Sequence, residues 1–364
     1  MATFKKVKFK NFVTLQRGFD LPKGTRTDGE YPVVASTSIT GHHNEYKVKA
    51  PCVTTGRSGA LGEVLYIKQD CWPLNTTLWV KDFKGNNPKF VYFKLKTLGL
   101  EKFNAGAGVP TLNRNHLDGL VLDVPDLSIQ TRIASVLSAY DNLIENNEKR
   151  IKILEEMAQR LYTEWFVKFK FPGHEKVKMV ESGTEYDLIP EGWDVRDIDS
   201  LLSPVKRKRK LLTNEYNKVG MFPVVDQGNQ FITGYTDDEE TIYDEDLIVF
   251  GDHTRCFKYC NFTFACGADG TQLLKTNNAG RMPQILLYFT VLNAGLQNYN
   301  YARHFKFLKS LKVLLPDFTT AKVFESIIKP TYEQIKKMQL VNSESAKIRD
   351  LLIPQLVMGK RGLN

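Results

Sequence analysis

The stretch 125–167, PDLSIQTRIASVLSAYDNLIENNEKRIKILEEMAQRLYTEWFV, decides the fold. Its apolar residues recur in alternating steps of four and three, which is the heptad spacing of a long helix that packs against another helix. One polar residue, Asn147, falls within this seam, where such a residue fixes the register of a coiled coil. The predicted helix-pair seam comprises Ile133, Leu137, Tyr140, Ile144, Asn147, Ile151, Leu154, Ala158, Leu161 and Trp165.

Three further apolar residues, Val136, Leu143 and Met157, widen this stripe, so the helix is expected to contact more than one neighbour. A second, weaker seam begins at Thr319. We expect an interruption at Pro330, because proline removes a helical hydrogen bond. The second seam has Ser345 and Arg349 where apolar residues would be wanted. Beyond Pro330, the second seam continues through Ile335, Met338, Asn342, Leu352 and Leu356.

The sequence also contains an internal repeat. YPVV at 31–34 returns as FPVV at 222–225, and ITG at 39–41 returns at 232–234. Pro88 and the Pro-Asp pair at 125–126 likewise have counterparts 191 to 195 residues further on. These matched segments occur in the same order and at near-constant spacing, which indicates a tandem duplication of a globular unit followed by a helix.

The fold class is therefore expected to be α+β: two repeated mixed α/β domains separated by two long antiparallel helices that form a coiled coil. The predicted parts are a first domain at 1–127, a central helix at 128–170, a linker at 171–189, a second domain at 190–317 and a C-terminal helix at 318–364. Strands are expected at 52–55, 64–67, 78–80, 247–250 and 262–265, and helices at 89–98 and 284–293.

Composition favours a globular protein with an anionic partner. Of the 364 residues, 42% are hydrophobic and 25% are charged, and the net charge is +9, which favours a polyanion. No run of about 18 apolar residues predicts a membrane span, and the first ten residues lack the apolar core of a signal peptide. Five dispersed cysteines suit reduced thiols, so a cytoplasmic location is expected.

Several segments resemble the specificity subunits of type I restriction-modification systems. PDLSIQTRIA at 125–134, NNEKRI at 146–151 and MAQRLYTEWFV at 157–167 look like the central spacer of that family, and IRDLLIPQL at 348–356 resembles its C-terminal spacer. PEGW at 190–193 is similar to the entry of its second target recognition domain. GDHTR at 251–255, GADGT at 267–271 and YARHFK at 301–306 are similar to a common version of that domain.

The resemblance implies a DNA-binding subunit without catalytic activity of its own. It would read a bipartite, asymmetric double-stranded DNA target and direct adenine methylation and restriction. Its partners would be two methyltransferase subunits that use S-adenosylmethionine, and ATP-driven endonuclease subunits that require magnesium. Trp165 and Phe166, at the end of the first seam, are expected to help dock the methyltransferase subunits.

Candidate base-reading residues gather in loops, where Arg suits guanine, Asn and Gln suit adenine, and the Thr methyl suits thymine. Any one of them is equally at home in a capped turn. The first domain offers Ser38, His42, His43, Asn44, Thr55, Arg57, Ser58, Asn75, Thr76, Asn113 and Arg114. The second offers Gln227, Asn229, Gln230, His253, Thr254, Arg255, Thr271, Gln272, Arg303 and His304. The Thr55/Arg57 and His253/Arg255 loops, and the pair Thr76/Thr271, are taken as matched positions in the two repeats.

The densest basic run is expected either to contact DNA phosphates or to form a solvated loop. It comprises Lys206, Arg207, Lys208, Arg209 and Lys210.

Enzymatic alternatives find little support. The glycine-rich segment 56–62 precedes a predicted strand, whereas a dinucleotide loop must open a helix; a phosphate or base contact and a structural turn remain open there. NPKF at 87–90 predicts a helix start rather than a methyltransferase motif, and Asp126 and Asp317 predict helix caps rather than nuclease ligands. His253, Cys256, Cys260 and Cys266 lack zinc spacing and favour buried thiols over a metal site. The rival functions are a standalone nuclease or methyltransferase, and a structural adaptor that does not read sequence.

Overall fold

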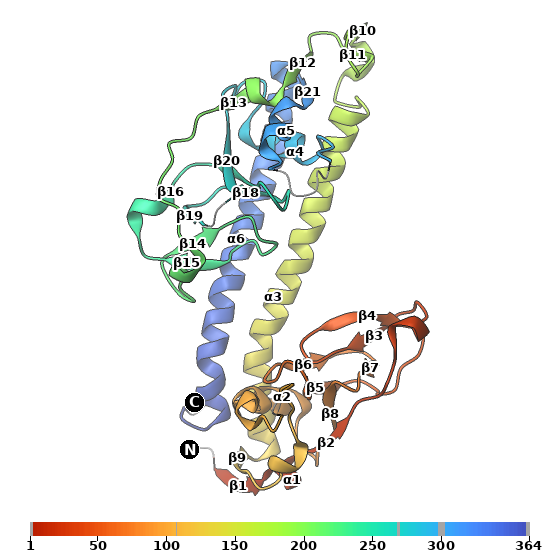
Figure 1. Cartoon of the computed structure of the whole chain (residues 1–364), viewed down its shortest axis with the longest axis vertical. Helices are drawn as coiled ribbons and strands as arrows, with labels where there is room; N and C mark the ends of the chain where they lie inside the picture. The colour runs from red at the N-terminus through yellow and green to blue at the C-terminus, as the bar shows by residue number, and fades with distance from the viewer. Residues whose placement is uncertain (1–2, 107, 268–269, 298–302, 362–364) are drawn as a thin grey trace. The chain divides into compact units, whose positions relative to one another are not determined.

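A computed structural model describes residues 3–106, 108–267, 270–297 and 303–361 (Figure 1). The chain divides into unit 1, which comprises Met1–Asn146 and Val341–Asn364, and unit 2, which comprises Asn147–Leu340. Each unit combines helices with small sheets, so the predicted mixed α and β class is confirmed. Within the described residues, no helix is long and apolar enough to span a membrane.

Unit 1 contains nine strands, two short helices and parts of two long ones. The strands are β1 (Phe4–Lys8), β2 (Thr14–Arg17), β3 (Tyr31–Val34), β4 (Ile39–His43), β5 (Cys52–Gly56), β6 (Val64–Ile67), β7 (Trp72–Pro73), β8 (Thr77–Asp82) and β9 (Val121–Pro125). The helices are α1 (Phe9–Phe12), α2 (Pro88–Lys96), the first part of α3 (Leu127–Tyr162) and the last part of α6 (Phe318–Val357).

Unit 2 contains the remaining parts of α3 and α6 and the other elements. Its strands are β10 (Met179–Glu181), β11 (Leu188–Pro190), β12 (Asp194–Asp197), β13 (Leu202–Ser203), β14 (Phe222–Val225), β15 (Gly234–Thr236), β16 (Ile242–Tyr243), β17 (Leu247–Gly251), β18 (Phe257–Cys260), β19 (Phe264–Cys266), β20 (Thr271–Thr276) and β21 (Lys312–Leu315). Its short helices are a π-helix (Thr163–Val167), α4 (Gln284–Leu292) and α5 (Phe305–Ser310).

The strand order confirms the duplication. The sheet β2-β8-β5-β6 of unit 1 matches β13-β20-β17-β18 of unit 2. Strand β3 pairs antiparallel with β4 and parallel with β7, just as β14 pairs antiparallel with β15 and parallel with β19. The antiparallel pairs β1–β9 and β12–β21 also correspond. Two units with one topology, at matched sequence spacing, are repeats of one ancestral fold.

The predicted short elements are present with small shifts at their ends. Strands lie at all five predicted places, although Phe262 and Thr263 fall outside β19. Helix α2 begins as NPKF predicts: the side chain of Asn87 accepts hydrogen bonds from the amides of Lys89 at 3.0 Å and Phe90 at 3.1 Å, with Pro88 in the first turn. Asp317 accepts the amide of Thr320 at 3.0 Å, which confirms its role as a cap.

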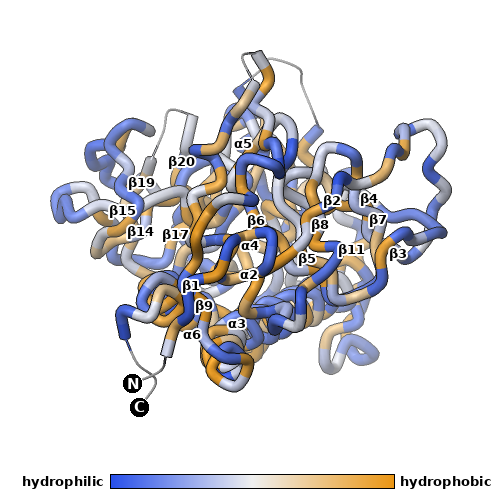
Figure 2. The backbone as a smooth tube through the Cα atoms, turned by 90° about the horizontal axis from the view of Figure 1, so that it is seen from below, coloured by the Kyte–Doolittle hydropathy of each residue, from blue (hydrophilic) through white to orange (hydrophobic). Residues whose placement is uncertain are grey.

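Each unit has its own hydrophobic core, and the hydrophobic colour in Figure 2 concentrates on helices and strands rather than on the outer loops. The core of unit 1 joins Phe90 and Phe93 of α2 to Leu137 of α3 and Leu356 of α6. Lys94 is buried among them, and its ammonium donates to the carbonyls of Asp123 at 2.9 Å and Val357 at 3.2 Å. The end of α6 is thereby an integral part of unit 1.

Within each unit, the segments of α3 and α6 run antiparallel. In unit 1, Asp141 pairs with Arg349 at 2.8 Å, while the carbonyl of Ile144 accepts from Asn342 at 3.5 Å. In unit 2, the ring of Tyr162 lies 6.3 Å from that of Phe324, and Glu155 and Tyr332 line one pocket. Every residue of the predicted seam, Asn147 included, is buried or half-buried, as are Ile335, Met338, Leu352 and Leu356.

Two predictions about the helices are wrong. Helix α6 is not interrupted at Pro330, because Ile328, Tyr332 and Ile335 on either side are buried in the core of unit 2. That burial outweighs the roughly 3 kcal/mol cost of an interior proline. Trp165 and Phe166 are 6% and 4% exposed within the same core, so they have no surface to offer a docking partner. Trp165 does contact α6, with its ring 5.9 Å from Phe324.

Candidate nucleic-acid interface

In unit 2, three loops meet at the end of β17. The hydroxyl of Thr254 donates to the carbonyl of Gln227 at 2.7 Å, and the amide of His253 donates to the side-chain oxygen of Gln227 at 3.4 Å. Gly270 has φ +79°, and a Cβ there would stand 2.8 Å from the His253 ring. A side chain at 270 would therefore push the loops apart, so glycine permits this close approach.

Asp252, which the sequence analysis did not single out, ties these loops to α5. It is 2% exposed, and its carboxylate accepts the amide of Phe305 at 2.7 Å. Its carbonyl accepts the amide of His304 at 3.0 Å and lies 2.8 Å from the Nδ1 of that ring. Its own amide donates to Gly270 at 2.7 Å. Nothing in the sequence distinguishes such a buried carboxylate from a surface turn residue.

Arg255 follows in the left-handed backbone region, with φ +60°. Its guanidinium makes one long hydrogen bond, 3.5 Å to the carbonyl of Leu296, and its side chain is half-buried. Three further candidates are exposed and lie close in sequence to these loops: Asn229, Gln230 and Arg303. These residues keep donors and acceptors available to a base edge. Ala268, Asp269, Tyr301 and Ala302 of the family-like motifs lie outside the described residues.

Unit 1 builds the equivalent cluster at the end of β5. The Ser36 hydroxyl lies 2.9 Å from the carbonyls of both Ser58 and Thr76, and the amide of Arg57 donates to Thr76 at 2.8 Å. The Arg57 guanidinium donates to the carbonyl of Asn75 at 3.1 Å. Ser36 stands 191 residues before Gln227, so the same three loops meet in both repeats.

Asn113 and Arg114 join this cluster, because the neighbouring Leu112 amide donates to the carbonyl of Arg57 at 2.8 Å. Asn113 caps a short turn, and Arg114 donates to the carbonyl of Leu15 at 3.1 Å. The other candidates of unit 1 lie elsewhere. They lie on β4 or directly beside it, and β4 belongs to a different sheet from β5. These residues are Ser38, His42, His43 and Asn44.

Four candidates have buried side chains. Thr55, Thr271, His43 and His304 are 1%, 1%, 6% and 2% exposed. The Thr271 hydroxyl donates to the carbonyl of Gly267 at 2.8 Å, and His43 accepts from the amide of Thr27 at 3.1 Å. Their placement supports the loops and leaves no surface for a base contact. The match of Thr76 with Thr271 is also wrong: Gly56 pairs with Thr77 where Gly251 pairs with Thr271, so Thr77 is the counterpart.

The basic run 206–210 is only partly available to a ligand. Arg209 forms ion pairs with Glu215 at 2.6 Å and Asp238 at 2.7 Å, and Lys210 donates to the carbonyl of Thr271 at 2.6 Å. The Lys208 ammonium hydrogen-bonds the carbonyl of Ile242. Lys206 is exposed, and Arg207 borders a pocket described below.

These contacts predict unequal effects on the salt dependence of DNA binding. Lys206→Gln removes a free charge and is expected to lower the slope of log K against log salt by about 0.9. Arg209→Gln removes a charge already neutralised by two carboxylates, so its slope stays near that of the parent protein. Fluorescence anisotropy of a labelled duplex across a salt series measures both. Equal slopes for the two variants would contradict the assignment of Lys206 as a phosphate contact.

The remaining sequence motifs have structural roles. Segment 56–62 leads into β6, a strand, which removes the dinucleotide interpretation. Cys260 and Cys266 are buried on β18 and β19, and burial raises the pKa of the Cys266 thiol to about 11. Within the described residues, His, Cys, Asp and Glu form no group of three that could hold a metal ion.

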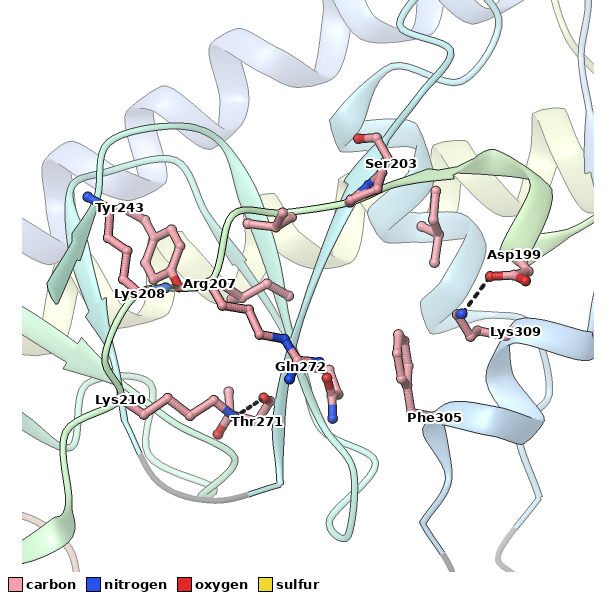
Figure 3. Close-up of a pocket in the computed structure, with 14 residues that line it drawn as sticks. Asp199, Ser203, Arg207, Lys208, Lys210, Tyr243, Thr271, Gln272, Phe305 and Lys309 are labelled. Carbon is pink, nitrogen blue, oxygen red and sulfur yellow. Dashed lines mark hydrogen bonds and ion pairs between the residues drawn. The ribbon is translucent and has the colours of Figure 1, made fainter.

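Beside the loops of unit 2 lies a pocket of about 330 Å³ (Figure 3). The basic run, the start of β20 and α5 form its walls, which include Arg207, Gln272 and Phe305. Sequence reasoning identified Arg207 and Gln272 but missed Phe305, whose place at the pocket depends on the fold of α5.

Comparison with known proteins agrees with this architecture. Residues 1–156 match the type I restriction modification DNA specificity domain. The type I restriction enzyme MjaIX specificity subunit of Methanocaldococcus jannaschii is 26% identical over 304 residues, which cover 74% of this chain and 68% of that protein. A putative type I specificity subunit of Mycoplasma pneumoniae, S.MpnORF285P, is 25% identical over 166 residues, which cover 43% of this chain and 54% of that protein.

The fold also has a solved relative. The crystal structure of a type I restriction-modification system S subunit from M. genitalium is similar with a TM-score of 0.64 at 16% identity, over 98% of this chain and 96% of that one. The resemblance to type I specificity subunits inferred from the sequence is thereby confirmed.

Proposed function

We propose that this chain reads a bipartite, asymmetric DNA target and directs partner subunits to it. The observation that supports the proposal is the repeated loop cluster: three loops meet at the end of β5 in unit 1 and at the end of β17 in unit 2. Loops on a rigid scaffold are where binding residues concentrate. One fold repeated in two units supplies two such surfaces.

The two clusters carry different side chains, which accounts for an asymmetric target. Arg57 stands in unit 1 where unit 2 has Asp252. Gln227 replaces Ser36 at the matched position. Because each side-chain type prefers a different base edge, the two half-sites differ in sequence.

The partners follow from the proposed role. The chain itself would not catalyse the reaction; methyltransferase subunits would supply S-adenosylmethionine, and endonuclease subunits would use ATP and magnesium. Exposed apolar side chains on the long helices offer docking surface for two methyltransferase subunits. In unit 1 they include Val136, Leu143, Ile348 and Leu351, and in unit 2 Ile153, Met157, Val323 and Ile327.

The test is co-expression with a cognate methyltransferase subunit, followed by genome-wide mapping of methylated adenines. The expected result is a motif of two specific blocks around an unread gap, present only when both chains are expressed. Methylation at one continuous block would contradict the two-domain reading. Methylation or cleavage by the purified chain alone would favour the rival standalone enzyme. Equal affinity for all sequences in a competition binding assay would favour a structural adaptor.

A further inference from the structure

The pocket beside β20 in unit 2 is strongly cationic. Its lining includes Arg207, Lys208 and Lys210 from the basic run and Lys309 from α5. Asp199 is the one carboxylate among the lining residues, and it pairs with Lys309 at 2.7 Å. The pocket therefore has an excess of positive charge in a concave site, which favours an anionic ligand.

Two polar side chains of this pocket are not committed elsewhere. Lys208 and Lys210 are held by backbone carbonyls, as described above. The side chains of Arg207 and Gln272 make no hydrogen bond or ion pair with any residue that the structure describes. An arginine fork suits a phosphate, and a glutamine amide offers one donor and one acceptor side by side.

Phe305 forms a flat wall opposite these two groups. Figure 3 shows its ring facing the space into which Arg207 and Gln272 extend, on the side away from the basic run. The backbone of Phe305 is held by the buried carboxylate of Asp252, which accepts its amide at 2.7 Å, and its ring packs 6.2 Å from that of Phe250 and 5.3 Å from the Lys309 ammonium. A planar aromatic or heterocyclic group can stack on such a wall.

Unit 1 has a second pocket with a similar excess of positive charge. Beside β2, which corresponds to β13, a more open pocket is lined by Arg17, Lys81 and Arg114, with Asp20 as its carboxylate. Arg114 stands 191 residues before Phe305, the same offset as the β9 and β21 anchors. Positive charge therefore recurs beside the loops of both repeats, and each pocket has a phenylalanine in its lining, Phe19 in unit 1 and Phe305 in unit 2.

We propose that the unit 2 pocket binds a nucleotide, with its phosphate at Arg207, its base stacked on Phe305 and the base edge against the Gln272 amide. A glutamine amide matches the donor and acceptor pattern of adenine, so an adenine nucleotide is the preferred ligand. The nucleotide is either an unstacked residue of a DNA strand or a free mononucleotide. The site stands on its own geometry and does not require the two-domain reading of DNA proposed above.

The experiment measures binding of fluorescently labelled AMP to the full chain by anisotropy, with unlabelled AMP, CMP, inorganic phosphate and a single-stranded oligonucleotide as competitors. Phe305→Leu and Arg207→Gln are each expected to weaken binding about tenfold or more. Lys218→Gln is the matched control, since it removes one exposed charge of unit 2 outside the pocket, and it is expected to change binding less than twofold. Circular dichroism melting confirms that each variant is folded.

Each competitor distinguishes one outcome. Displacement by CMP as effective as that by AMP overturns the preference for adenine at Gln272. Displacement by AMP and by the oligonucleotide at similar nucleotide concentrations supports the site and identifies a DNA strand as a source; displacement by AMP alone supports a free nucleotide. Displacement by inorganic phosphate as effective as that by AMP overturns the proposal, because Phe305 would then play no part. Equal losses in Arg207→Gln and Lys218→Gln also overturn it, and so does the absence of AMP binding to the parent protein. None of these results depends on whether the methylated motif proves bipartite.

Discussion

Arg255→Ala relaxes one half of the recognised sequence and leaves the other half strict. Arg255 lies in the loop after β17, and among the described residues its guanidinium has a single 3.5 Å hydrogen bond, which leaves most of its donors open to a guanine edge. Losing a bidentate base contact costs about 1–3 kcal/mol of discrimination, which is roughly 10- to 100-fold between the matched and the mismatched base. The φ of +60° strains arginine and alanine alike, so the backbone penalty is unchanged by the substitution.

Methylated-adenine mapping of co-expressed variants measures this effect position by position. The matched control is Arg57→Ala in the equivalent loop of unit 1, which is expected to relax the opposite half. Equal loss of affinity for target and scrambled DNA would remove Arg255 from the set of base-reading residues. Relaxation of the same half by both substitutions would argue against one half-site per repeat.

Unit 2 is expected to unfold cooperatively in mild alkali. Four tyrosines, Tyr162, Tyr259, Tyr288 and Tyr332, belong to or border its core, and burial raises the pKa of each above the ordinary value of 10.0, that of Tyr288 to about 12. Above pH 10 the unfolded chain loses these protons while the folded unit keeps them. The free energy of unfolding therefore falls as pH rises, by about 1.4 kcal/mol per pH unit for each tyrosine.

With all four acting together, the loss is about 5 kcal/mol per pH unit, which is a large share of the stability of a typical domain. Tyrosinate absorbance at 295 nm and far-UV circular dichroism, followed together between pH 9 and pH 12, should change in one step. Tyr288→Phe should make the pH dependence of stability shallower by about 1.4 kcal/mol per pH unit. Gradual ionisation with no loss of circular dichroism would refute the prediction.

The fold could be predicted where its signals are local or repeated. The seam from Ile133 to Trp165 predicted α3 because every turn contributes a residue to one face, and the duplicated anchors predicted the matched sheets. The predicted interruption at Pro330 was wrong because the proline penalty is local. The burial of α6 residues that outweighs it depends on contacts with α3, α4 and β18. Arg349 looked misplaced in its seam because its partner, Asp141, is 208 residues away.

The candidate site was predictable at the level of loops and not of side chains. The segments around Arg57 and His253 do lie in the clusters, because polar residues after a buried strand must leave the sheet. Whether a strand residue such as Thr271 faces inward depends on which face of β20 is covered, and no local pattern reports that. Lys258 is another residue whose burial the local sequence does not reveal, since it is 4% exposed. Burial lowers the pKa of its ammonium, which donates to the carbonyl of Asp226 at 2.8 Å.

The place of the last turns of α6 in the core of unit 1 has a consequence for synthesis. Ile353, Leu356 and Val357 pack against α2 and α3, and Lys94 donates to the Val357 carbonyl. A ribosome that has translated all of β1 to β9 has therefore not yet made the residues that close this core. The segment synthesised first completes its folding last, after unit 2 has emerged. A nascent chain that stops before residue 353 would release unit 2 with its core sequence complete, tethered to an N-terminal portion that exposes apolar surface to chaperones and proteases.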